Sequence, residues 1–391
     1  MRIILHELRK IWRPGVLLLL AAFSVMFYYL FMSFNIDYFP NGHPATEIVN
    51  FSAEWTKKYG PTLELEEREK AEQQMDELYA EAMQWIYSDP TFAKVGIYSY
   101  SDAQEIMNKD EESEEEWSAR SLLFSDKCGY IGFRIQALDN ILEQYDKSQG
   151  TETETYFSEI FTPQEVERML QIHADRLYQN IMPEEVIENL LQYIRQVLVL
   201  LILSMCILLA PLLVRDRITR VNELQVSSRV GRKIYWSQFG AVILSAFLLT
   251  TIELLIVGGI YTTTGTYIFR NNMLNSFLSV IFSWFDWNYG TYVLVMIGLA
   301  YLFALGTATF VFFMSRFSVN YITMILKLIP VFVVLSIISN RVTTYCFMFS
   351  NPIYNRTGIV GIEFIVCIAL LVFGISTCIF TGILEKHKEF T

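Results

Sequence analysis

The chain has 391 residues, of which 53% are hydrophobic, 15% aromatic and only 18% charged. Soluble proteins carry ~25% charged residues, so this composition, with its apolar residues in long clusters, excludes an ordinary soluble protein and indicates an integral membrane protein. The net charge of −11 is unevenly distributed, because residues 35–189 hold 33 acids and 12 bases while the remainder is basic. An acidic outer part and basic inner loops are typical of a bacterial plasma-membrane protein.

Six apolar stretches predict an all-α membrane protein with six transmembrane helices and both termini in the cytoplasm. Before the first of them, basic and apolar residues alternate at helical spacing, which predicts an amphipathic helix at the inner membrane surface. The expected parts are an elbow helix (1–13), the first span (14–34), an acidic helical extracytoplasmic domain (35–190), the second span (191–214), a cytoplasmic loop (215–233), the third span (234–260), an outer interfacial segment (261–290), the fourth span (291–315), an inner turn (316–320), the fifth span (321–339), an outer loop with a candidate re-entrant stretch (340–357), the sixth span (358–383) and a cytoplasmic tail (384–391).

Local signals predict helices within the extracytoplasmic domain. Apolar residues at three- and four-residue spacing predict helices that begin near Leu65 and near Ile131. Capping patterns predict two further helix starts, one at Ser101 with Gln104 and one at Thr162 with Pro163. The run of acids over 110–116 indicates a solvated surface, and the alternative is a docking site for a cationic peptide or a divalent ion.

Two outer segments carry further expectations. The aromatic stretch 271–287 predicts an interfacial helix with Trp284 and Trp287 at the level of the head groups. The apolar stretch 345–349 is expected to dip into the outer leaflet. Cys128 and Cys346 would both face outward and could pair, but two unclustered cysteines do not make a disulfide framework.

The sequence lacks the motifs of the common enzyme classes. It contains no phosphate-binding P-loop, no HExxH zinc motif and no GxSxG nucleophile elbow. Its four histidines lie far apart, and its five cysteines show no metal-binding spacing. We therefore expect no catalytic, cofactor-binding or metal site in this chain, and no binding to nucleic acid.

The stretch 215–233 lies between two apolar segments and is too polar to remain in a bilayer. It carries six basic residues against two acids, which marks the cytoplasmic side. Apolar residues recur at every third position, which predicts a short amphipathic helix along the membrane surface. We expect this stretch to receive force from a separate motor protein.

Two acids fall inside predicted spans, Glu253 in the third and Glu363 in the sixth. Ionisable residues within a membrane are expensive and mark functional sites by default. We expect them, with Arg195, to line a substrate path. The alternative is structural, in which the acids reach the outer interface or pair with Arg195.

The chain resembles the permease subunits of the ABC-2 family of ABC transporters. The resemblance lies in the opening sequence HELRKIWRPG before the first span, in the six-span order with a large outer insertion, and in the sequence ELQVSSRVGRK before the third span. Four positions depart from the family pattern, namely the pair Arg220-Val221, then Arg229 and Gln238. The resemblance implies a transmembrane permease subunit that exports a peptide, lipid or drug-like substrate. It also implies a second permease subunit in a homo- or heterodimer, and a partner ATPase that binds ATP and magnesium. The ATPase would contact the 215–233 stretch through Ile218, Val221, Glu223, Leu224, Ser227, Ser228, Arg229, Gly231, Arg232 and Lys233.

A different class of function fits the same composition. The protein could be a motor-free, membrane-anchored binding or immunity protein whose acidic outer domain captures a cationic ligand. An ATPase that co-purifies with the chain would distinguish the first hypothesis from the second.

Overall fold

The computed structural model describes residues 2–109, 111–149, 161–219, 231, 234–279 and 281–387. Over these residues the protein is all-helical, with two isolated β-bridges and no β-strand. The chain forms two compact units. We call the first the bundle unit (Met1–Asp37, Glu188–Thr266 and Gly290–Thr391) and the second the insert unit (Tyr38–Ile187 and Tyr267–Tyr289).

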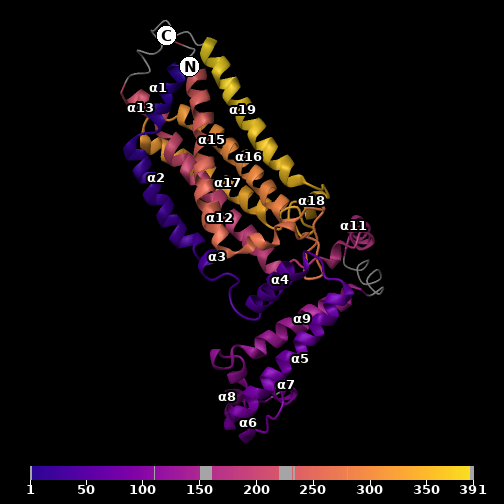
Figure 1. Ribbon diagram of the computed structural model, residues 1–391. Helices are drawn as coiled ribbons and strands as arrows, with labels where there is room; N and C mark the ends of the chain where they lie inside the picture. The colour runs from indigo at the N-terminus through magenta and orange to yellow at the C-terminus, as the bar shows by residue number, and fades with distance from the viewer. Residues whose placement is uncertain are drawn as a thin grey trace. The chain divides into compact units, whose positions relative to one another are not determined.

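Six helical stretches of the described chain are long and apolar enough to cross a membrane, which confirms the expected number (Figure 1). They contain between 19 and 35 residues, and at ~1.5 Å per residue even the shortest approaches the ~30 Å of a hydrocarbon core. They are Pro14–Met32, Glu184–Ile218, Ile234–Thr264, Tyr289–Arg316, Tyr321–Thr343 and Ile362–Leu384.

Proline sets two of the helix starts in the bundle unit. Pro14 and Pro211 each open a helix, where their missing N–H costs nothing. The helices of this unit are α1 (Arg2–Ile11), α2 (Pro14–Phe27) with a π-helical turn (Tyr28–Met32), α3 (Phe34–Asp37), α12 (Glu184–Leu209), α13 (Pro211–Ile218), α15 (Ile234–Tyr261), α16 (Tyr289–Arg316), α17 (Tyr321–Thr343), α18 (Tyr354–Thr357) and α19 (Ile362–His387).

Close packing joins the helices of the bundle unit. Helix α1 lies against α15 and also contacts α13 at the same end of the bundle (Figure 1). Between α16 and α19 the contact depends on glycine, because a Cβ at Gly374 would collide with Thr309 and a Cβ at Gly306 would crowd Leu370. Small residues at such positions let transmembrane helices approach closely.

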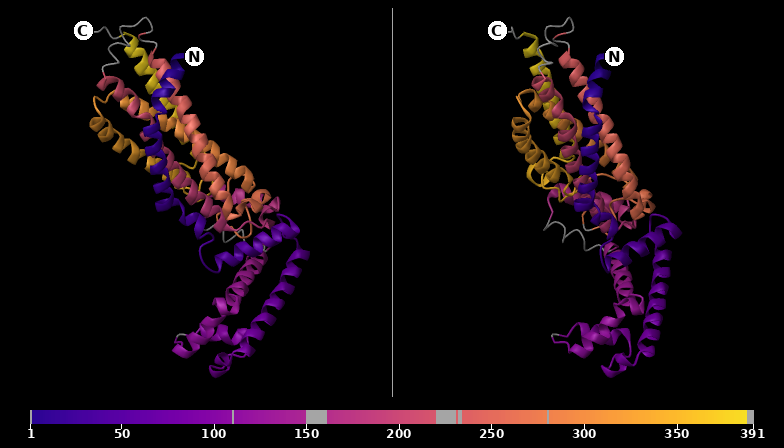
Figure 2. Two further views of the ribbon diagram at one scale, coloured as in Figure 1. Left: turned by 60° about the vertical axis from the view of Figure 1, so that its left-hand side comes forward. Right: turned by 90° about the vertical axis from the view of Figure 1, so that its left-hand side faces the viewer.

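The insert unit has its own hydrophobic core. Its two longest helices, α5 (Leu65–Ser88) and α9 (Ile131–Ser148), lie side by side (Figure 2), and both begin where the apolar spacing predicted. Buried residues recur along both helices. The remaining helices are α4 (Ala45–Tyr59), α6 (Pro90–Lys94), α7 (Tyr100–Met107), α8 (Glu114–Leu123) and α11 (Pro163–Ala174), with short 3₁₀ turns at Asp126–Cys128 and Leu177–Gln179. A further 3₁₀ turn, Thr266–Asn271, lies where the chain enters this unit from the bundle unit, and the turn Thr262–Thr264 belongs to the bundle unit.

One of the two predicted capping patterns is confirmed and the other is wrong. Thr162 caps α11 and exchanges hydrogen bonds with Glu165. Helix α7 begins two residues earlier than expected, because Ser99 and Asp102, rather than Ser101 and Gln104, form the reciprocal pair. An acidic residue at the third helical position makes the stronger cap here, since its carboxylate accepts from two backbone N–H groups.

The predicted interfacial helix over 271–287 is wrong. After Asn271 the described chain is irregular, and it is held to the rest of the insert unit by side chains that bond to backbone groups. Ser276 donates to the carbonyl of Asn180 at 2.7 Å and accepts from the N–H of Met182 at 3.0 Å. Ser276 also accepts from the nearby N–H of Leu278 at 3.1 Å, and such local bonds between side chain and backbone compete with helix formation. Trp284 is buried in this arrangement.

Most of the apolar stretch 345–349 is buried inside the bundle unit, which accounts for its hydrophobic sequence. Cys346, Phe347, Met348 and Phe349 are at most 3% exposed. Tyr292 of α16 donates to the Cys346 carbonyl at 2.9 Å. The thiols of Cys128 and Cys346 are both free, so the structure contains no disulfide between them.

Candidate functional site

The expected ATPase-contacting loop lies mostly outside the described residues. This applies to Val221, Glu223, Leu224, Ser227, Ser228, Arg229, Arg232 and Lys233. The described chain includes Ile218, which ends α13 with 51% of its side chain exposed, and the buried Gly231. What the structure defines is therefore the two helices that flank the loop, α13 before it and α15 after it.

A buried charge cluster joins these two helices to α1. The Lys10 ammonium lies 2.8 Å from a carboxylate oxygen of Glu7 and 3.0 Å from one of Asp216. Gln238 of α15 donates a hydrogen bond to the same Asp216 oxygen at 3.2 Å. Glu7, Asp216 and Gln238 are all buried. Helices α1, α13 and α15 thus meet at one carboxylate.

Opposing effects act on the Lys10 ammonium. Burial lowers its pKa, but the hydrogen bonds and charges of Glu7 and Asp216 outweigh burial and raise the pKa above its ordinary value. Lys10 therefore keeps its charge at neutral pH. A buried carboxylate such as Asp216 would be strongly unfavourable without this cation.

Two neighbouring contacts extend the cluster. Trp12 donates from its indole N–H to the buried Ser245 hydroxyl of α15 at 3.0 Å. Arg217 of α13 donates to the carbonyl of Ser318 at 2.7 Å and also to that of Arg316. The end of α13 is thereby bonded to the turn between α16 and α17.

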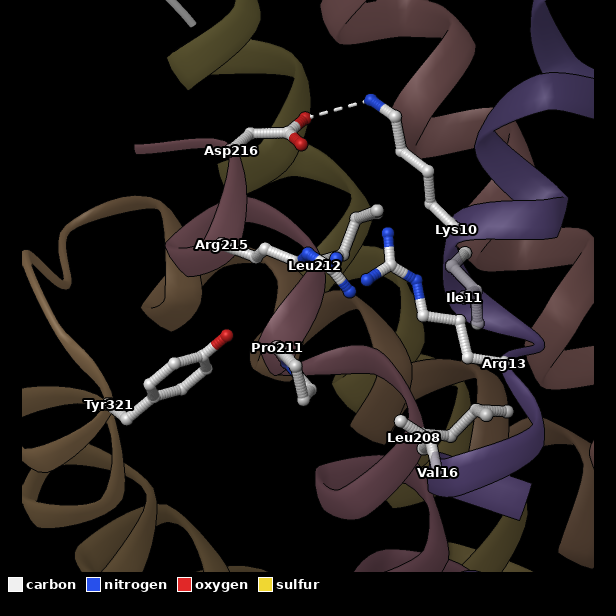
Figure 3. A pocket seen from close by; sticks show the side chains of 10 residues that line it. All are labelled: Lys10, Ile11, Arg13, Val16, Leu208, Pro211, Leu212, Arg215, Asp216 and Tyr321. Carbon is white, nitrogen blue, oxygen red and sulfur yellow. Dashed lines mark hydrogen bonds and ion pairs between the residues drawn. The ribbon is translucent and has the colours of Figure 1, made fainter. Parts of the chain in front are cut away.

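A small pocket lies beside the cluster. Its volume is about 100 Å³, and three basic side chains, one acidic side chain and a tyrosine line it together with apolar residues (Figure 3). The basic residues are Lys10, Arg13 and Arg215. Sequence analysis marked the basic excess of this region, but not the pocket or the buried acids that position Lys10.

Glu253 lies in the interior of the bundle unit. It is 6% exposed, and neither carboxylate oxygen has a hydrogen-bond partner among the described residues. The Ser204 hydroxyl of α12 is close enough to interact with this carboxyl, yet it too makes no hydrogen bond of normal geometry in the described chain. An acid that makes no hydrogen bond of normal geometry with the described residues is available for a ligand or a proton.

The suggested pairing of Arg195 with the two glutamates is wrong. In the part of the chain that the structure describes, no ion pair joins Arg195 to either acid. Arg195 instead donates to the Thr344 hydroxyl at 3.2 Å. Glu363 is 1% exposed and accepts a hydrogen bond from the N–H of Phe347 at 2.7 Å. Arg195 and Glu363 therefore both contact the 344–347 loop, which leaves Glu253 as the acid without an assigned structural role.

No family model, no curated protein and no solved structure matches this chain. The function must therefore be argued from the residues themselves.

The first prediction concerns the charge cluster. Substitution of Lys10→Gln leaves Glu7 and Asp216 buried without their cation, which should lower the free energy of unfolding by about 3 kcal/mol. Denaturation of the purified protein in detergent measures this change. The control is Arg9→Gln on the exposed face of the same helix, which should change stability by less than about 0.5 kcal/mol. Equal losses in the two variants would contradict the cluster.

The second prediction separates the two interior glutamates. Glu253→Leu removes a buried acid that has no partner in the described chain, so the protein should be as stable as wild type or more stable. Glu363→Leu should cost about 1–3 kcal/mol, because it leaves the buried N–H of Phe347 without an acceptor. The same unfolding measurement compares them, and an equal loss in both variants would show that Glu253 has a structural partner.

Proposed function

We propose that the protein is the transmembrane permease subunit of an ATP-driven transporter of the ABC-2 type. It would export a peptide, lipid or drug-like substrate across a bacterial plasma membrane. ATP and magnesium would bind to a separate ATPase subunit, and a second permease subunit, alike or paralogous, would complete the substrate path.

The observation that carries this proposal is the way the flanks of the 215–233 loop are held. Asp216 lies at the start of the loop and Gln238 follows its end. The two side chains bond to each other, and Asp216 also bonds to Lys10 of α1. A force applied to the loop would therefore reach α1, α13 and α15 together. If an ATPase beside the membrane drives transport, it needs such a rigid connection between the loop and several helices.

The proposed topology places this cluster on the cytoplasmic side. The loop carries six basic residues, and basic loops between close spans face the cytoplasm. Helix α1 would be the elbow helix at the inner surface, both termini would be cytoplasmic, and the insert unit would be the extracytoplasmic domain.

Glu253 would contribute to the substrate path. It is the interior acid that the described structure leaves without a hydrogen bond, and it would attract a cationic group of the substrate or carry a proton. Arg195 and Glu363 would support the path indirectly, since both bond to the outer 344–347 loop.

The third prediction tests the motor. The tagged full-length protein, isolated in mild detergent from its native cells, should retain an ATPase with a P-loop that mass spectrometry identifies. Combined substitution of Glu223→Ala and Arg232→Ala should reduce the retained ATPase at least fivefold. The control is Glu66→Ala with Lys70→Ala, which removes an exposed ion pair from α5 of the insert unit and should leave retention unchanged.

The opposite results would favour the alternative function. A wild-type protein that purifies without any ATPase, and that binds a cationic peptide through the insert unit, would be a motor-free binding or immunity protein. Equal ATPase retention in the loop variant and the control would remove Glu223 and Arg232 from the contact.

A further inference from the structure

We propose that the pocket between Arg13 and Arg215 binds the phosphate group of an anionic phospholipid. The inference rests on the pocket and on the six membrane-crossing helices, and it holds whether or not the protein is moved by an ATPase. The pocket residues come from α1, the start of α2, the α12–α13 junction and the start of α17.

The position of the pocket along the spans places it at the level of the lipid head groups. Arg13 directly precedes the stretch Pro14–Met32, and Tyr321 is the first residue of the stretch Tyr321–Thr343. Arg215 lies three residues before the end of Glu184–Ile218. The ends of three spans therefore meet here, and arginine and tyrosine at span ends are the side chains that contact the head-group region.

Two guanidinium groups point into this pocket, those of Arg13 and Arg215 (Figure 3). Neither forms an ion pair or a side-chain hydrogen bond with any other residue that the structure describes. Asp216, the acid of the pocket, is bonded to Lys10 and Gln238. Among the described residues the two arginines therefore carry the uncompensated positive charge of the pocket. The planar guanidinium is the group best suited to bind phosphate through paired hydrogen bonds.

Apolar side chains also line the pocket. They are Val16, Leu208, Pro211 and Leu212, at the start of α2 and across the α12–α13 junction. Charged and apolar side chains in one pocket match a phosphodiester with its glycerol and the first carbons of an acyl chain. A soluble phosphate would use the charged side chains alone.

The size of the pocket also favours a head group over a transported molecule. Its volume of about 100 Å³ is well below the roughly 300–1,000 Å³ of pockets that enclose drug-sized ligands. A phosphate fits such a space, while the remainder of the lipid stays in the bilayer. Arg13 and Arg215 carry like charges and repel each other. A bound lipid phosphate would hold the two side chains together, and it would thereby fix the start of α2 against α13.

The fourth prediction uses native mass spectrometry of the full-length, delipidated protein in detergent. Phosphatidylglycerol should bind as a discrete adduct, and diacylglycerol of the same acyl chains, which lacks the phosphate, should not. Arg13→Gln and Arg215→Gln should each weaken phosphatidylglycerol binding at least tenfold. Arg9→Gln removes the same charge from the exposed face of α1, outside the pocket, and should leave binding unchanged. Circular dichroism would verify that each variant keeps its helical content.

Each remaining outcome would count against the proposal. Equal weakening by Arg9→Gln would show attraction by general positive charge and not a site. Equal binding of diacylglycerol would show an apolar cleft without phosphate recognition. Saturation by inorganic phosphate at concentrations that displace phosphatidylglycerol would assign the pocket to a soluble phosphate and overturn the lipid.

Discussion

The arrangement of α1, α13 and α15, at the end of the bundle where they meet, depends on the ion pair between Lys10 and Asp216. It joins side chains 206 positions apart in the sequence. It also neutralises a carboxylate that would otherwise be buried at high cost. Because Gln238 bonds to the same oxygen, removal of Asp216 would break polar bonds that join both α1 and α15 to α13. The helices on either side of the 215–233 loop are therefore connected to each other inside the protein, before any partner binds.

The interior acids show that similar residues in similar spans have different roles. Glu363 accepts a hydrogen bond from the backbone of the 344–347 loop. This structural role is sufficient to explain why an acid lies at that buried position. Glu253 has no such bond in the described chain, and the protein tolerates an unfavourable group there. Natural proteins keep destabilising polar groups mainly where function requires them. This contrast is the physical reason for assigning Glu253, and not Glu363, to the proposed substrate path.

Signals that are local in sequence predicted much of the fold. Long apolar stretches predicted the six spans, and the pattern of Thr162, Pro163 and Glu165 predicted the start of α11, because each depends on residues close together in the chain. Two features could not be predicted from such local signals. The Lys10–Asp216 pair depends on tertiary proximity, and the 271–287 segment depends on bonds from Ser276 to backbone groups almost a hundred positions away. Aromatic composition alone favoured an interfacial helix there.

We propose that a separate ATPase acts on this chain at the loop beside α13. A photo-crosslinking amino acid at Ile218, the exposed last residue of α13, tests this contact when the protein is expressed in its native membrane. We expect a covalent adduct between position 218 and a P-loop ATPase, and no such adduct from Tyr87, which is exposed on the insert unit. An ATPase adduct at position 87, or none at position 218 in a correctly inserted protein, would show that the ATPase does not act at this loop.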